Sequence, residues 1–256
     1  MTTIARHLLS LFAIVSLSFV VGPTARAELI TGGNATFVFN NNSPLFQGGG
    51  GPFIMSRFYG TDVDTATGTD ITGGIGGDPI SVPGSGLVSE GAVLNGGSVV
   101  NPTGRSRQTT NLNVDFSNVL ATWGGGEQAG VDAVLRTTVD PLFGGGTIVL
   151  GDFSLINSGG TLVLQNNFTF PADAFTIGSP VFNDLGGGFS VTGNLLVSTS
   201  LSFLTGGIVP VGTNVGTFSM VAVPEPSTMG LVAASVVMGV ALRQARRAAK
   251  RDQRPV

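Results

Sequence analysis

The acid–base groups of residues 28–222 are almost entirely carboxylates, because this stretch contains no histidine, cysteine or lysine. The chain's one histidine, His7, and its one lysine, Lys250, lie in its terminal segments. Ser-His-Asp and Cys-His nucleophiles, Schiff-base catalysis and histidine-ligated zinc are therefore excluded. A carboxylate pair, as in a glycoside hydrolase, remains, yet Glu90 and Glu127 lie in Gly-rich stretches whose spacing gives neither a partner. We predict a protein that is not an enzyme and uses no cofactor.

The stretch DVDTATGTD is a weak candidate for a metal site. It places Asp62, Asp64 and Asp70 around Gly68, and hard cations such as calcium bind several oxygen ligands on a tight turn. The stretch lacks the Asp-Gly and later Glu that complete a helix–loop–helix calcium site. A solvated turn is the preferred interpretation, so we predict no bound metal.

Trp123, the only tryptophan, precedes a glycine loop in ATWGGGEQ. An exposed indole beside such a loop can stack on a sugar ring, which makes a carbohydrate-binding module the first alternative function. A tryptophan buried at a strand end is the commoner arrangement, because its large apolar ring contributes strongly to a core.

The elements that carry these residues are predicted to be strands, because apolar and polar residues alternate with period two. NLNVDFS (residues 111–117) alternates throughout, and LLVSTSLSF (residues 195–203) places Leu195, Val197, Leu201 and Phe203 on one face. GGG, NSGG and GG spacers separate such stretches and supply the positive φ angles of tight turns. Residues 126–139 are compatible with a helix or a strand.

The spacing of these stretches predicts an all-β, antiparallel β-sandwich or jelly-roll body. Between residues 144 and 203 a strand recurs roughly every 10 to 15 residues, as in such folds. Two similar pieces, GGGTIVLGDFSL and GGGFSVTGNLLVS, keep a β-solenoid as the alternative, although their period is irregular.

Charge is distributed very unevenly along the chain. Residues 28–222 hold 13 acidic residues and four arginines, a net charge of −9. This excludes a nucleic-acid partner, since such binding requires basic residues that neutralise phosphates. The chain has no cysteine, so its stability must come from core packing and backbone pairing without disulfides.

Residues 1–27 read as a secretory signal peptide. Arg6 and His7 form a short basic region, residues 8–21 are an apolar run, and Gly22-Pro23 ends its helix. A small-x-small pattern follows and predicts cleavage before Glu28. The residues of the cleavage site are Ala25, Ala27 and Glu28.

The C-terminal end predicts a membrane helix followed by a basic tail. Residues 228–242 are uncharged and mostly apolar, and residues 243–256 are retained in the cytoplasm by the positive-inside rule. Residues 28–222 therefore form an exported body. The basic residues of the tail are Arg243, Arg246, Arg247, Lys250, Arg251 and Arg254.

A rigid motif joins the body to this helix: Val223, Pro224, Glu225, Pro226 and Ser227. Both prolines have a fixed φ and no N–H, so the motif stays extended and displays its carboxylate at the membrane surface. The motif, the short helix and the basic tail, in that order over residues 223–256, resemble the PEP-CTERM sorting signal of bacterial envelope proteins.

This resemblance implies processing by an exosortase, a membrane protease or transpeptidase that cuts near the motif. It also implies an exported protein that is anchored by its C-terminal helix and then located at the cell surface or secreted. We expect a non-catalytic structural or extracellular-matrix protein, with extracellular polysaccharide as a further partner. A carbohydrate-binding module and a carboxylate-based glycoside hydrolase are the alternatives.

Overall fold

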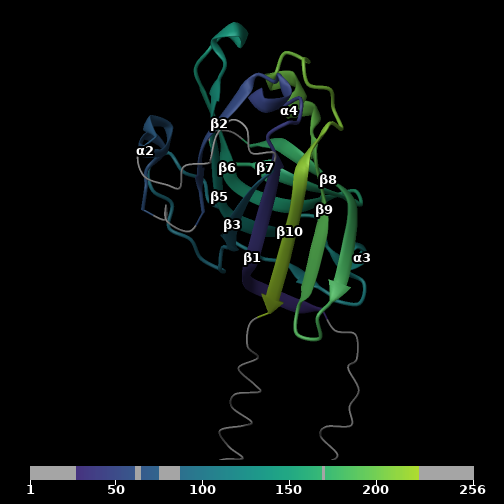
Figure 1. Ribbon diagram of the computed structural model, residues 1–256. Coiled ribbons are helices and arrows are strands. Elements are labelled where there is room, and N and C mark those ends of the chain that lie inside the picture. The colour runs from purple at the N-terminus through teal and green to yellow at the C-terminus, as the bar shows by residue number, and fades with distance from the viewer. Residues whose placement is uncertain (1–26, 61–64, 75–86, 169–170, 225–256) are drawn as a thin grey trace, which may run out of the picture.

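The computed structural model describes residues 27–60, 65–74, 87–168 and 171–224, which form strands joined by short helices (Figure 1). The strands are β1 (Glu28–Asn40), β2 (Phe53–Tyr59), β3 (Leu87–Leu94), β4 (Asn113–Val114), β5 (Gln128–Val139), β6 (Thr147–Ser158), β7 (Thr161–Asn166), β8 (Ala172–Asp184), β9 (Phe189–Val197) and β10 (Asn214–Pro224). The helices are η1 (Gln47–Gly49), α2 (Gly68–Gly73), α3 (Val119–Thr122), η3 (Pro141–Phe143) and α4 (Thr199–Leu204).

Eight of the strands close into an antiparallel barrel. β1 pairs with β3 along one edge and with β10 along the other. The pairing runs from β10 through β9, β8, β7, β6, β5 and β3 back to β1, so the sheet has no free edge in this ring. β2 pairs with the second half of β5, and β4 pairs with the first residues of β1.

Phenylalanine side chains fill the barrel. On β1, Phe37 and Phe39 are fully buried and alternate with residues that face outward. The ring centroid of Phe37 lies 5.7 Å from that of Phe153 on β6 and 5.2 Å from that of Phe218 on β10. An eight-stranded barrel is just wide enough for side chains to fill it. These aromatic contacts therefore join several strands through one core.

Two glycines permit the close approach of β1 and β10 along the seam that closes the barrel. Gly33 has φ +144°, and a Cβ there would lie 2.0 Å from the carbonyl oxygen of Val221. Gly216 has φ +152°, and its Cβ would lie 2.0 Å from the carbonyl oxygen of Val38. Both positions therefore require a residue without a side chain.

The prediction of an all-β, antiparallel body is confirmed, but the predicted architecture was wrong. One sheet closes on itself in place of the two sheets of a sandwich or jelly roll, and in place of the alternative β-solenoid. Strand spacing along the chain does not distinguish these folds. The difference depends on the pairing of β1 with β10, the first and last strands, which no local pattern reveals.

Two local expectations are also resolved. Residues 126–139 contain β5, so the strand option is the one that forms. The strand predicted over residues 195–203 ends at Val197, because the Ser198 hydroxyl accepts a hydrogen bond from the Leu201 N–H (3.1 Å) and caps α4. Phe203 consequently lies exposed on α4 and not on a buried strand face.

In the ranges described above, no helix is long and apolar enough to cross a membrane. The predicted membrane helix (residues 228–242), the basic tail (residues 243–256) and residues 1–26 of the predicted signal peptide lie outside the described residues.

Replacing Gly33 with alanine should lower the free energy of unfolding by about 1–3 kcal/mol, because it forces a side chain into a strained backbone against β10. Urea denaturation of the mature protein measures this change. The neighbouring Gly32 is the control, since a Cβ there has no atom within 4 Å. Gly32→Ala should change the free energy by less than about 0.5 kcal/mol. Equal losses in both variants would show that close packing at the seam is unimportant.

Candidate functional site

The sorting motif predicted from the sequence begins inside the barrel wall. In the ladder between β1 and β10, Gly32 pairs with Val223 and Ile30 pairs with Pro224, the last described residue. A proline is tolerated at this position because the end of a strand does not need every N–H. Glu225 and the rest of the motif, Pro226 and Ser227, lie outside the described residues, as do Ala25 and the basic tail.

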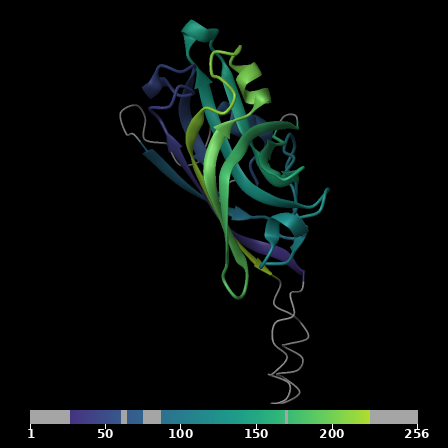
Figure 2. The ribbon, with the colours of Figure 1, turned by 90° about the vertical axis from the view of Figure 1, so that its right-hand side faces the viewer.

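The two ends of the described chain leave the barrel at the same pole. Ile30, two residues after the first residue of β1, pairs with Pro224 at the end of β10. Figures 1 and 2 show β1 starting and β10 ending at the pole opposite α4. The predicted signal-cleavage point, before Glu28, and the sorting motif therefore adjoin one end of the body.

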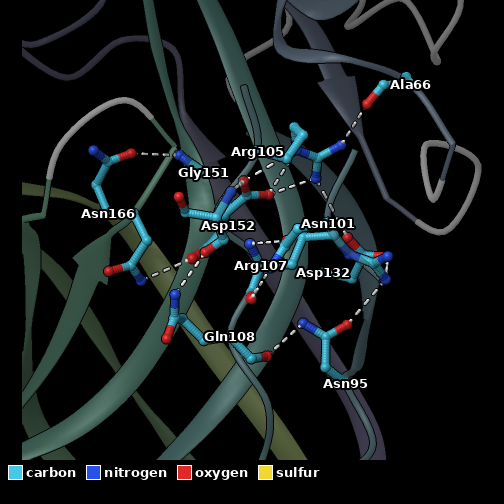
Figure 3. Close-up of polar contacts among 12 residues, drawn as sticks. Ala66, Asn95, Asn101, Arg105, Arg107, Gln108, Asp132, Gly151, Asp152 and Asn166 are labelled. Atoms are coloured by element: carbon cyan, nitrogen blue, oxygen red, sulfur yellow. Dashed lines mark hydrogen bonds and ion pairs between the residues drawn. The ribbon is translucent and has the colours of Figure 1, made fainter. Parts of the chain in front are cut away.

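A second polar feature, which the sequence did not predict, is a buried network of two arginines and two aspartates (Figure 3). Arg105 donates from Nε to both carboxylate oxygens of Asp152, at 2.9 and 3.0 Å, and also donates from Nη2. Arg107 donates from Nη2 to Asp132 Oδ2 at 2.9 Å. Arg105 Nη2 lies 3.7 Å from Asp132 Oδ1, which links the two pairs.

An irregularity between β5 and β6 positions these carboxylates. Between Val131 and Val134 of β5, two residues face a single residue of β6, Asp152. One of the two is Asp132. Asp152 adopts φ +49°, a left-handed conformation that aspartate tolerates better than most residues. Such a bulge redirects side chains out of the regular alternation, and here it places both aspartates beneath the same connection.

That connection, residues 95–112 between β3 and β4, packs directly onto β5. A Cβ on Gly130 would lie 1.8 Å from the carbonyl oxygen of Gln108. The backbone N–H of Ser106 donates to Asp152 Oδ2 at 2.8 Å, and Arg107 donates from Nη2 to Asn95 Oδ1 at 3.2 Å. The network therefore fastens a long connection to the barrel, and β5 is buried on both faces.

A signal for this network was present in the sequence. The body has four arginines in all, and two of them, Arg105 and Arg107, are two residues apart, so they share one side of an extended segment. Arginines this scarce and this close indicate a specific partner. Their partners, Asp132 and Asp152, are far along the chain, and the local pattern gave no means of choosing them.

The structure uses Asp70, a member of the weak metal candidate, as a helix cap. Its carboxylate accepts from the Thr67 N–H at 2.9 Å, and Thr67 Oγ1 accepts from the Asp70 N–H at 3.2 Å. The bond from the Thr67 backbone holds the pKa of Asp70 below its usual value. Asp62 and Asp64 lie outside the described residues. Among the described residues, no three acidic or histidine side chains gather as metal ligands.

Trp123 is buried, so it offers no exposed face for a sugar. Its Nε1 donates to the carbonyl oxygen of Glu127 at 3.1 Å, and the Glu127 carboxylate accepts from the Gly124 N–H at 3.0 Å. These bonds close the turn before β5. The short antiparallel ladder between β3 and β5 pairs Val93 with Asp132. Glu90, on β3, lies beyond one end of this ladder and Glu127 lies beyond the other end, so the two glutamates are not brought together.

Replacing Asp152 with asparagine should lower the free energy of unfolding by about 3–5 kcal/mol, because Arg105 keeps a buried charge without its carboxylate. Asparagine also tolerates a positive φ, so the loss reports charge rather than backbone strain. Chemical denaturation measures it.

Asp184→Asn is the matched control, since Asp184 is exposed and serves a turn by accepting from the Gly186 N–H. Its effect should stay within about 0.5 kcal/mol. If Asp152→Asn is equally mild, the network does not hold the connection in place.

Comparisons with known proteins locate one match. A family model described as the PEP-CTERM protein-sorting motif matches residues 222–247. Searches of curated proteins and of solved structures found no match. The match begins at Ala222, within β10, and covers the motif at residues 223–227, the predicted membrane helix and the first basic residues of the tail, Arg243, Arg246 and Arg247. The C-terminal region of this chain therefore carries a PEP-CTERM protein-sorting motif.

Proposed function

We propose that this chain is a structural protein of the bacterial cell surface or extracellular matrix, with a non-catalytic barrel delivered by exosortase processing. The motif at residues 222–247 implies an exported, envelope-associated protein on which an exosortase, a membrane protein, acts. The proposal has three further parts: a structural role for the body, a temporary anchor at residues 228–242, and extracellular polysaccharide as a neighbour.

The observation that carries the proposal is the direct continuation of β10 into the motif. Val223 and Pro224 are still paired with β1, so no spacer separates the folded body from the processing signal. An exosortase that acts at Glu225 must therefore work next to the folded end of the barrel. This arrangement supports a body that stands with its two chain ends toward the membrane.

The interior and the buried charges support a structural role for the body. The barrel is filled by side chains such as Phe37 and Phe153. Asp132 and Asp152, two buried carboxylates of the barrel wall, are held by arginines within the fold. Carboxylates engaged in this way hold a connection in its place in the fold, whereas a hydrolase needs them free beside a substrate.

Replacing Glu225 with alanine should leave export intact and cause the full-length, anchored form to accumulate. The reason is that the motif then lacks the one carboxylate held between its two prolines. Pro226→Ala should act in the same direction, because it loosens the extended frame. The intact mass of the protein recovered from membrane and surface fractions reports the cleavage.

Asp184→Ala is the control, because it removes an exposed acidic residue at the same pole, where β8 turns into β9. It should be processed as the wild type is. A mature mass that is identical in the wild type and in both motif variants would refute processing at this motif.

A further inference from the structure

The pole of the barrel opposite the chain ends has an exposed apolar surface, which we term the apolar tip. Three connections form it: residues 41–52, residues 140–146 and residues 198–213, which include α4 (Figures 1 and 2). Leu142 is 89% exposed and Phe203 is 83% exposed. The exposed apolar residues of the tip are Leu142, Phe143, Phe203, Leu204, Ile208 and Val211. Apolar surface gathered in this way marks a binding surface more often than single exposed residues do.

The apolar tip is almost free of charge, whereas residues 28–222 carry a net charge of −9. Its three connections contain one ionisable residue, Asp140. The Asp140 carboxylate already accepts hydrogen bonds from Gln47 Nε2 at 3.1 Å and from the Leu142 N–H at 2.8 Å. A partner without charge where it makes contact therefore fits this surface.

The tip combines a protruding side chain with a groove that can receive one. The groove has a volume of about 560 Å³ and lies where the three connections meet. Beside it, Phe203 projects from α4 and lines a separate hollow with Thr199 and Ser200. The apolar residues that line the groove include Phe53, Val139, Phe143, Ile148, Leu204 and Ile208. A projection and a socket on one surface are what a two-fold symmetric contact requires, because each copy supplies both.

We propose that the apolar tip binds the apolar tip of a second copy of this chain, with Phe203 of each copy placed in the groove of the other. Contact at this pole removes apolar side chains from water. It also places the acidic bodies end to end. Most of their charges are then farther apart than the Debye length, roughly 8–10 Å at physiological salt, so that their repulsion is screened. The C-terminal end of β10 in each copy then lies at the pole away from the contact. The inference is independent of processing at Glu225, and either can fail alone.

Single-cysteine variants test the contact, because the natural chain has no cysteine that would form competing disulfides. The full chain with Leu142→Cys, purified in mild detergent and oxidised, should form a disulfide-linked dimer on a non-reducing gel. Leu185→Cys is the control, since Leu185 is exposed at the opposite pole, and it should stay monomeric. Equal dimer yields in the two variants would overturn the proposal.

A second substitution separates a specific contact from random collision. Adding Phe203→Asp to Leu142→Cys should raise the protein concentration needed for half-maximal dimer by about tenfold or more, as loss of an aromatic anchor does. Adding Leu185→Asp instead should leave it unchanged. Thermal unfolding of both variants should match that of the parent, because both side chains are exposed. A Phe203→Asp variant that is folded and still dimerises fully would refute the proposal.

Phosphatidylcholine vesicles identify the competing occupant, a lipid surface. The wild-type chain and the Phe203→Asp variant should bind these vesicles to the same extent. If Phe203→Asp lowers the vesicle-bound fraction below that of the wild type while the wild type stays monomeric at every concentration, the tip is a lipid-binding surface and the self-association proposal is wrong.

Discussion

The hydrogen-bonded seam between β1 and β10 is the interaction on which the rest of the fold depends. It joins the first and last strands, so the chain must close a loop of nearly its whole folded length before the barrel exists, at an entropic cost that grows only slowly with length. Packing in the core offsets that entropic cost, since Phe37 of β1 and Phe218 of β10 pack across the seam with ring centroids 5.2 Å apart. The sorting motif begins at the end of this same ladder, so its first two residues, Val223 and Pro224, take part in closing the barrel.

The buried arginine–aspartate network fixes the position of one connection, residues 95–112, on the barrel wall. Burying ion pairs is not an efficient source of stability, because the desolvation of the charges offsets most of their attraction. The contribution of this network is geometric. Arg105 contacts Asp152 through two nitrogens, and such a fork fixes direction as well as distance. A purely apolar contact would let residues 95–112 shift along β5, whereas this network defines one position.

Local patterns predicted the strands better than the way they assemble. Alternation correctly placed Leu195 and Val197 in the core, because burial on one face of a strand leaves a period-two record in the sequence. The same alternation continued past Ser198, where a capping hydroxyl starts a helix instead. Thr67 and Asp70 had the spacing of a capping box, which is a better interpretation of Asp70 than a metal ligand. Closure and the Arg105–Asp152 pair escaped prediction because they join residues that are distant in sequence. The sorting motif could be recognised from the sequence because its residues are contiguous.

The orientation of β10 determines how the barrel would respond to a mechanical force along its axis. A pull between the apolar tip and the C-terminal end of the body acts along the length of β10, which runs from Asn214 at one pole to Pro224 at the other. The strand is bonded to β1 on one side and to β9 on the other. Tension in this direction shears both ladders, so their hydrogen bonds must fail together and cannot peel apart one at a time. A force along β10 therefore meets more resistance than a force that pulls the strand sideways off its neighbours.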